Sequence, residues 1–402
     1  MSTRLTINRQ NGNVPKSLPG EDHVTGLIIY MASSDIPESF KNERVQPLST
    51  IDSAEAAGIV DYTIDADGTR TATPWIVRVL HYQLSELYRV NPGVSLYVGI
   101  FEKPEGNSMT FAEIKTLQNY ASGRIRQAGV WCGDRELSGD DLTALEGTGD
   151  ALAQEEAELS IIYAPKVVSV KDLPVNLAGE NKSRVSVVIG QTGSGTGAEL
   201  YKDKANAAKA SVSGLGVVLG LLSRSAVHQS IAYVKEFPTG ISLPAFGDGT
   251  LLRDVDRALT EALDDKGRYL FFITHTGIAG SYMNDSHNMD SAISDYSTIE
   301  SVRTMDKAVR GIRAYLKPEL AGNIYIDASS GKMASYSVAH LETVAGKALE
   351  DMERAGELSG YKVEIDPEQD ILSTGTVEIV IRNVAVAVMR RINVKIGYAK
   401  SV

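Results

Sequence analysis

The sequence predicts a mixed α/β (α+β) protein with more than one domain, and three observations support this fold class. Short runs of consecutive apolar residues, typical of buried strands, alternate with longer segments whose apolar residues recur at helical spacing. The length of 402 residues exceeds what one hydrophobic core usually supports. The stretch 391–401, RINVKIGYAKS, alternates apolar and polar residues, which indicates a strand with one apolar face.

The first hundred residues predict a strand, two helices and a strand, in that order. The run VTGLIIYM at 24–31 is the first strand, and a short helix follows around 53–57. A longer helix begins at Pro74 and ends before Asn91, where Asn-Pro-Gly interrupts it. The run 94–101 is a second buried strand. This order is typical of an α/β unit.

The rest of the chain continues to alternate helices and strands. The predicted helices cover 111–127, 142–158, 199–222, 251–263, 298–316 and 337–356. The predicted strands cover 129–132, 159–164, 185–190, 269–274, 323–326, 361–365, 376–382 and 384–398. The helix 298–316 has the clearest pattern, because Val302, Met305 and Val309 fall on one side of it. No internal repeat interrupts this series.

The composition limits the function classes. Hydrophobic residues at 43% and charged residues at 23% are ordinary for a globular protein, and no apolar run reaches the length of a membrane span, so we expect no membrane insertion. Cys132 is the single cysteine, which rules out an intramolecular disulfide and fits a reducing compartment. A net charge of −11 argues against nucleic acid as a partner.

Charge is distributed unevenly along the chain. Residues 134–158 contain nine acids and one base, whereas the segment from Asn383 onward contains four bases and no acid. We favour a solvated helix face for the acidic stretch. The alternative is that acidic and basic surfaces meet between subunits.

The sequence GQTGSGTG at 190–197 lies between a predicted strand and a predicted helix, where a phosphate-binding loop is found. Gly190 and Gly195 have the spacing of such a loop, but Thr196 and Gly197 stand where it requires Lys and Ser or Thr. The dinucleotide fingerprint lacks its acidic residue about 20 positions later. We therefore favour a glycine turn and keep a nucleotide-binding enzyme as the alternative.

Other candidate catalytic residues do not form a recognisable pattern. Asp285, His287 and Asp290 are metal-ligand types, but their spacing matches no established metal loop and favours a turn. Ser194 lacks the G-x-S-x-G context of a nucleophile elbow, and Cys132 beside a tryptophan is typical of a buried small hydrophobe. The histidines are scattered. We predict no catalytic, cofactor or metal site.

Four segments near the end of the chain occur in an order known from one protein family. They are DYSTIESVRTMDKAVRGIRAYLKPEL at 295–320, LETVAGKALEDM at 341–352, GYKVEIDP at 360–367 and VEIVIRNVAVAVMRRINVKIGYA at 377–399. In this order they resemble the C-terminal domain of contractile tail sheath proteins. Those proteins form the sleeves of contractile-tailed phages and of related contractile injection systems. The strand at 24–31 and the LYVGI run at 96–100 are compatible with this resemblance.

The resemblance implies a core domain built from both chain ends and an outward-facing inserted domain. The expected organisation is an extended arm at 1–20, a first core segment at 21–100, an inserted outer α/β domain at 101–250, a C-terminal core domain at 251–390 and a linker strand at 391–402. Such sheaths are stacked hexameric rings around a tail tube, joined to baseplate and terminator proteins. The expected location is a virion tail or injection particle made in the bacterial cytoplasm.

The resemblance also implies how the subunits connect. Arms at both chain ends enter neighbouring subunits and complete a small shared sheet, and they act as hinges while each subunit rotates during contraction. The expected interaction residues are Leu5, Ile7, Ile392, Val394, Lys395, Ile396 and Tyr398. The strand 376–382 offers an intramolecular partner for the tail as the alternative. Another tail or baseplate component is the remaining structural alternative.

Overall fold

A six-stranded sheet organises the larger part of the molecule. The computed structural model describes residues 20–65, 67–104, 109–203, 206 and 210–399. The strand order is β2-β5-β1-β6-β7-β8. The strands are β1 (Thr25–Met31), β2 (Val45–Leu48), β5 (Leu96–Glu102), β6 (Gln127–Glu136), β7 (Ser160–Lys166) and β8 (Val185–Val187). All neighbouring pairs are parallel except β2 with β5, and β2 carries a proline, which suits an edge strand.

Helices cover both faces of this sheet, which gives three layers. Helices α3 (Trp75–Val90) and α7 (Leu215–Arg224) pack on one face, and α4 (Glu113–Tyr120) and α5 (Gly139–Gln154) pack on the other. Successive side chains of β1 therefore enter different cores: Leu27 enters the first and Ile28 the second. This explains why β1 is a continuous apolar run.

The contact between α3 and α7 depends on a glycine. A Cβ added at Gly216 would lie 2.1 Å from the backbone oxygen of Gln83, so only glycine allows the two helices to approach this closely. The Gln83 side chain completes the contact, because its Oε1 accepts from the backbone N–H of Gly216 at 2.7 Å.

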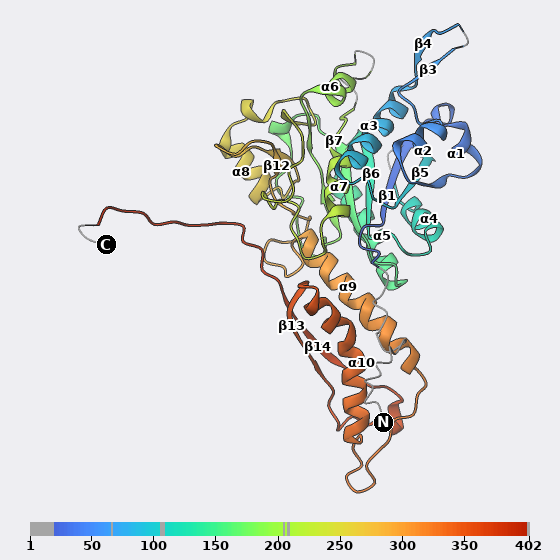
Figure 1. Cartoon of the computed structure of the whole chain (residues 1–402), viewed down its shortest axis with the longest axis vertical. Coiled ribbons are helices and arrows are strands. Elements are labelled where there is room, and N and C mark those ends of the chain that lie inside the picture. The colour runs from blue at the N-terminus through green and yellow to red at the C-terminus, as the bar shows by residue number, and fades with distance from the viewer. Residues whose placement is uncertain (1–19, 66, 105–108, 204–205, 207–209, 400–402) are drawn as a thin grey trace, which may run out of the picture.

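Smaller elements surround the three layers, and together with them they form what we call the body (residues 20–298). They are α1 (Glu38–Asn42), α2 (Ile51–Ala56), β3 (Tyr62–Ile64), β4 (Arg70–Ala72), β9 (Gly190–Thr192), α6 (Gly195–Lys202), β10 (Pro244–Phe246), α8 (Arg257–Asp265), β11 (Phe272–Ile273) and β12 (Tyr282–Met283). The β3–β4 hairpin projects from the body (Figure 1). No helix in the described chain carries an apolar stretch of the kind that a transmembrane span requires.

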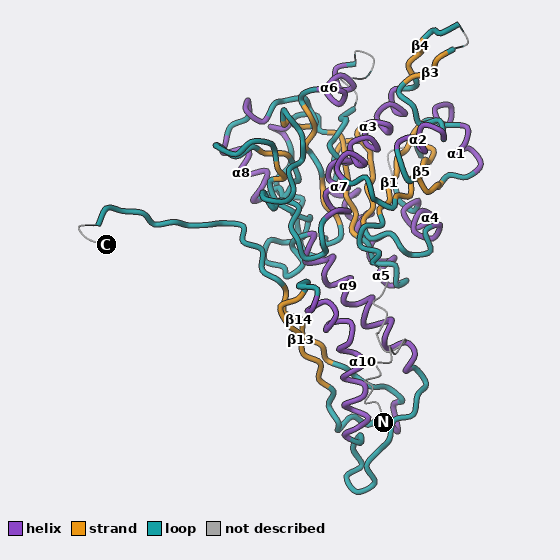
Figure 2. The backbone as a smooth tube through the Cα atoms, in the orientation of Figure 1, coloured by secondary structure: helices purple, strands orange, loops and turns teal. Residues whose placement is uncertain are grey.

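The remaining residues form a second, elongated unit, which we call the C-terminal part (residues 299–385). It consists of α9 (Ile299–Leu316), α10 (Ser335–Arg354), β13 (Leu358–Glu364), α11 (Ile371–Thr374) and β14 (Val380–Ala385). β13 and β14 form an antiparallel hairpin beside α10, and Ala308, Leu349 and Met352 belong to a small core of their own (Figure 2).

Charged side chains join the body to the C-terminal part. Arg184 makes two hydrogen bonds to Asp306, at 3.0 and 3.2 Å, and Arg313 donates to Glu158 at 2.6 Å. Arg303 is buried in this joint, and burial lowers its pKa to about 10. The joint is thus ionic, unlike the two apolar cores of the body.

Sequence expectations about several single elements are wrong. The helix expected at 199–222 is two helices, α6 and α7. Residues 210–213, which precede α7, belong to no helix or strand, and the Val212 carbonyl accepts from Trp131 Nε1 at 3.0 Å. The helix expected at 111–127 ends at Tyr120, where Ser122 and Gly123 have positive φ. The strand expected at 323–326 is reduced to a single bridge between Ile326 and Met333.

The sheet also crosses the boundary expected at residue 100. Strands β2, β5 and β1 come from 21–100, whereas β6, β7 and β8 come from 101–250, and all six share one sheet. The boundary expected at 250 falls within the body, because Leu263 and Tyr269 join the second core. Which segments face outward or toward a tube stays a prediction.

Candidate functional site

The segment that follows β14, residues 386–399, is the candidate functional site, and we call it the tail. Figures 1 and 2 show it leaving the molecule as an extended loop. The structure assigns it no strand and no backbone partner within the described residues. The strand expected at 384–398 therefore ends at Ala385 in the single chain.

The side chains that define the apolar face of the tail are open to solvent. Ile392, Val394 and Tyr398 are exposed, and Ile396 is 96% exposed. Lys395, on the opposite face, has no acidic partner among the described residues. Exposed apolar groups in a regular series favour an interaction surface over a solvated loop. Leu5 and Ile7 lie outside the described residues.

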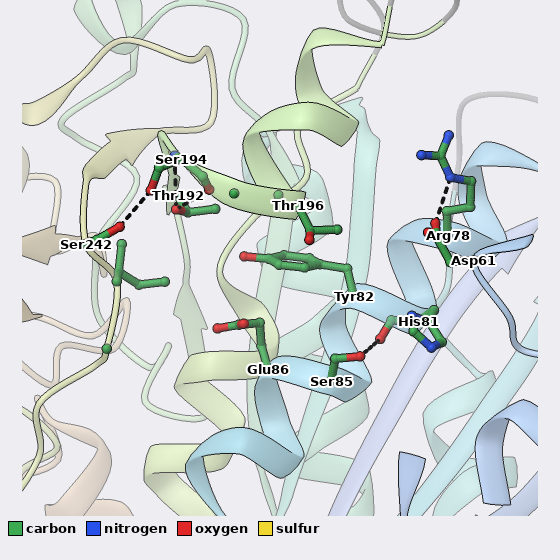
Figure 3. Close-up of a pocket in the computed structure, with 14 residues that line it drawn as sticks. Asp61, Arg78, His81, Tyr82, Ser85, Glu86, Thr192, Ser194, Thr196 and Ser242 are labelled. Atoms are coloured by element: carbon green, nitrogen blue, oxygen red, sulfur yellow. Dashed lines mark hydrogen bonds and ion pairs between the residues drawn. The ribbon is translucent and has the colours of Figure 1, made fainter. Parts of the chain in front are cut away.

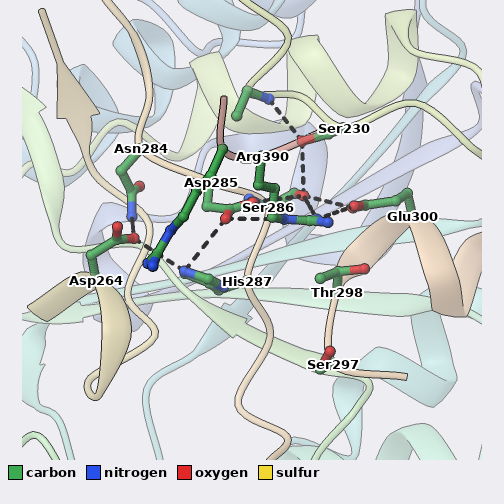
Figure 4. A network of polar contacts seen from close by, with 12 residues as sticks. Ser230, Asp264, Asn284, Asp285, Ser286, His287, Ser297, Thr298, Glu300 and Arg390 are labelled. Carbon is green, nitrogen blue, oxygen red and sulfur yellow. Dashed lines mark hydrogen bonds and ion pairs between the residues drawn. The ribbon is translucent and has the colours of Figure 1, made fainter. Parts of the chain in front are cut away.

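Arg390 fixes the root of the tail to the body. Its Nε donates to both carboxylate oxygens of Asp285, at 2.9 and 3.1 Å, and its Nη2 donates to Glu300 and, at 3.3 Å, to the hydroxyl of Ser286 (Figure 4). The Ser286 hydroxyl donates to Glu300 at 2.6 Å and lies 2.9 Å from that of Ser230. We call Arg390, Asp285, Ser286 and Glu300 the tail anchor.

The electrostatics of the tail anchor favour a charged Arg390. Burial opposes its charge, but Glu300 and Asp285 outweigh this effect, so the pKa of Arg390 rises above its ordinary value. Glu300 lies in the first turn of α9, where the helix dipole also stabilises a carboxylate. Arg391 adds an ion pair with Asp265 at 2.9 Å, but both side chains are exposed, so this pair contributes little.

The alternative intramolecular partner for the tail is contradicted. β14 covers only the second half of the expected strand 376–382 and pairs with β13 along six register positions, not with the tail. This pairing leaves one outer edge of β13 and one of β14 without a strand partner in the described chain. Open edges are templates for an added strand.

The glycine-rich sequence at 190–197 comprises β9, the residues 193–194 and the start of α6, and it borders a pocket of about 470 Å³ (Figure 3). A Cβ at Gly197 would lie 2.4 Å from the methyl group of Thr192 and 2.8 Å from the hydroxyl of Tyr82, so close packing explains this glycine. The charged groups at the pocket are already paired, Asp61 with Arg78 at 2.9 Å and Glu86 with Arg89 at 2.6 Å. Two carboxylates at the pocket do not favour a phosphate.

The Asp285–Asp290 segment is irregular, with a single bridge between His287 and Thr298, and its carboxylates bind protein groups. His287 Nε2 lies 3.0 Å from Asp264, and the Asp290 carboxylate accepts from the backbone N–H of Ser291 at 2.9 Å. Within the described residues, no group of three His, Cys, Asp or Glu side chains has an arrangement that could hold a metal. Asp285 instead belongs to the tail anchor.

Cys132 is buried, as expected of a small hydrophobe, and burial raises its pKa well above the ordinary value. The partners of Arg390 are the functional residues that the sequence analysis missed. Asp285 and Glu300 lie 105 and 90 positions from Arg390 along the chain. The only signal was the adjacent pair Arg390-Arg391, which indicated a need for acidic partners without locating them.

Comparisons with solved structures identify chains of the same fold. The chain is similar to a chain of the anti-feeding prophage helical sheath in its contracted state, with a TM-score of 0.62, 16% identity and 98% coverage of both chains. It is also similar to a chain of the anti-feeding prophage baseplate, with a TM-score of 0.59, 14% identity, and coverage of 99% of this chain and 100% of that one. These likenesses confirm the expected α/β sheath-type fold.

A search of curated proteins finds no significant match. Residues 59–287 match the N-terminal domain of DUF2586, and residues 295–402 match its C-terminal domain. These two matches meet close to the joint between the body and the C-terminal part. The chain belongs to the DUF2586 family.

Proposed function

We propose that the chain is the structural subunit of a contractile tail sheath, which polymerises around a tail tube and contracts to drive the tube through a target envelope. The observation that carries this proposal is the tail: an extended, apolar-faced segment with no strand partner in its own described chain. The fold shared with a contracted sheath chain supports it.

Strand exchange is the proposed link between subunits. The tail of one copy adds to the open edge of the β13–β14 hairpin of another, so that backbone hydrogen bonds provide affinity and alternate side chains fix the register. Ile392, Val394, Ile396 and Tyr398 form the buried face in this arrangement, and Lys395 lies on the opposite face. Leu5 and Ile7 are proposed to contribute a second exchanged strand.

Contraction then follows from the rigidity of the body and the mobility of its links. The two apolar cores make the body move as one unit, whereas extended segments between subunits change direction at little cost. The free energy comes from the difference between two sets of subunit contacts, so the proposal assigns no enzymatic activity and no cofactor. The proposed partners are a tail tube protein, baseplate proteins and a terminator protein.

The location follows from the same proposal. The subunit is made in the bacterial cytoplasm and functions in a virion tail or an injection particle. A baseplate-associated sheath subunit is the second candidate, because the likeness to the baseplate chain is almost as strong as that to the sheath chain. The length of the polymer separates the two: long tubes indicate a sheath, and single rings indicate a baseplate subunit.

Electron microscopy of the purified full-length protein tests the proposal, with striated tubes as the expected result. Ile396→Asp is expected to abolish the tubes, because burying an unpaired carboxylate costs several kcal/mol, on the order of 3 or more. Ile293→Asp is the matched control, since Ile293 is 94% exposed on the body and lies outside the tail. Tubes formed equally by both variants would contradict strand exchange, and no polymer at any concentration would contradict the sheath function.

A further inference from the structure

An apolar groove of about 650 Å³ lies at the end of the C-terminal part that is remote from the body (lower end in Figure 1). The end of α9, the start of α10 and the segment around α11 line it. Leu320 is 75% exposed there and Tyr336 60%, and the ring of Tyr336 lies 5.6 Å from that of Tyr325. A cluster of this kind, in a groove rather than on a convex surface, indicates a binding site.

Uncharged residues between Ile371 and Ile379 form one wall of the groove. They belong to the segment 365–381, which contains four acids and no Lys or Arg. Asp370 and Glu378 have no basic partner among the described residues. Glu319 also lines the groove, and its carboxylate lies 3.1 Å from Nε2 of His340. The occupant is therefore expected to be basic as well as apolar.

Segment 1–19 of the same chain has this chemistry. It contains three bases, Arg4, Arg9 and Lys16, and no acid, and Leu5 and Ile7 are its paired apolar residues. The tail is also basic, but Figure 1 shows it leaving in a different direction from the groove. Segment 1–19 is thus the part of the chain that matches both the charge and the apolar character of the groove.

Segment 1–19 joins the described chain at a point from which it is long enough to reach the groove. Asp22 lies against α9, with its carboxylate 2.6 Å from Lys307 and 3.5 Å from Arg310. Leu316, at the edge of the groove, is about 9 Å further along the helix axis than Arg310, at ~1.5 Å per residue. Nineteen extended residues span up to ~60 Å. The segment is therefore several times longer than the distance requires.

We propose that, in the free subunit, this groove holds segment 1–19 of its own chain, with the apolar residues against Leu320 and Tyr336 and the bases near Glu319 and the acids of 365–381. This contact goes beyond strand exchange, because it keeps the first exchange segment away from neighbouring copies until assembly begins. Only that consequence rests on the proposed sheath function. The docking itself is a property of one subunit.

Site-specific photo-crosslinking of the full-length chain tests the docking. A benzophenone amino acid replaces Thr6, between Leu5 and Ile7, and dilute protein is irradiated after its monomeric state has been verified by sedimentation. Peptide mapping of the monomer band is expected to place the crosslinks on 316–325, 336–341 or 371–379. Crosslinks found only elsewhere on the chain, or only between two copies, would overturn the proposal.

Variants of the groove complete the test. Leu320→Asp combined with Tyr336→Asp is expected to reduce the crosslink yield at least about tenfold, because the added carboxylates would be desolvated by the docked segment. Tyr336→Asp alone is the milder variant should the double variant unfold, and Ile293→Asp is the exposed control that retains full yield. An unchanged yield in a folded groove variant refutes the docking. Electron microscopy of the unlabelled protein reports on sheath assembly separately.

Discussion

Replacing Arg390 with methionine tests whether the ion pairs of the tail anchor contribute to the free energy of unfolding. Methionine keeps an unbranched stem and removes the guanidinium, which leaves Glu300 buried with a single hydroxyl partner, Ser286. Breaking a fully buried ion pair by removing one partner costs about 3–5 kcal/mol. The side chain of Arg390 is 34% exposed, so water replaces part of the lost interaction and we expect a loss of about 2 kcal/mol.

Urea unfolding at neutral pH measures this loss, and a double-mutant cycle assigns it to the pair. The cycle combines Arg390→Met with Glu300→Gln, and the expected coupling free energy is about 1–2 kcal/mol. Arg391→Met is the matched control. The Arg391 side chain is 80% exposed and that of its partner Asp265 58%, so its removal should change the free energy of unfolding by less than about 0.5 kcal/mol.

Two results would refute the reasoning about the tail anchor. Equal destabilisation by Arg390→Met and Arg391→Met would show that burial of Glu300 and Asp285 makes no difference. A coupling free energy below about 0.3 kcal/mol would show that Arg390 and Glu300 act independently, because the effects of mutations at sites without contact are additive to within about that value.

Two further predictions concern the body. Burial, ahead of the opposing hydrogen bond from the Arg184 N–H, raises the pKa of Glu146 to about 7 from an ordinary 4.5. The folded state thus binds the proton more tightly than the unfolded state, and the stability that this proton supplies is complete below pH 4.5 and is lost as the pH rises to 7. Urea unfolding should show that the free energy of unfolding of Glu146→Gln, measured relative to that of the parent protein, rises by about 2–3 kcal/mol between pH 5 and pH 8. A difference between the two proteins that does not change with pH would contradict the raised pKa of Glu146. Gly216→Ala should lower the free energy of unfolding by about 2 kcal/mol or more, because the added methyl group overpacks the contact of α3 with α7. Gly147→Ala in α5 has open space around the added Cβ and should raise the free energy of unfolding by about 0.5–1 kcal/mol. If Gly216→Ala were the more stable of the two variants, the close contact of α3 and α7 would be wrong.

Elements whose side chains follow one period could be predicted from the sequence. β1 is apolar from Leu27 to Met31 because it is buried on both faces. α9 has its apolar residues on one side, and its charged residues Arg303 and Asp306 are buried in the joint with the body. The expected helix 199–222 failed because its intervening backbone has hydrogen-bond partners on α3 and β6, namely Gln83 and Trp131. Tertiary contacts of this kind override local preference and leave no local trace in the sequence.

The sequence predicted the apolar-faced strand pattern of the tail, but it did not predict the strand partner of the tail or the acids that bind Arg390. Alternation at Ile392, Val394 and Ile396 indicates a strand wherever its partner comes from. The sequence could not show that the chain's own sheet ends at Ala385, because the same pattern fits an intramolecular and an intermolecular partner. The acids that anchor Arg390 come from a turn and a helix start, both of which are ordinary places for Asp and Glu.

The position of the tail anchor determines how a mechanical load enters the subunit. A pull applied to residues 392–399 meets Arg391 and Arg390 before it reaches β14. Without these contacts the pull would act directly on the end of the β13–β14 ladder, where hydrogen bonds break one after another at low force. With them, several charged contacts must fail together, and the load passes through Glu300 into the first turn of α9. Tension on the tail is thereby led into α9, and the β13–β14 hairpin is spared the strain of holding the tail.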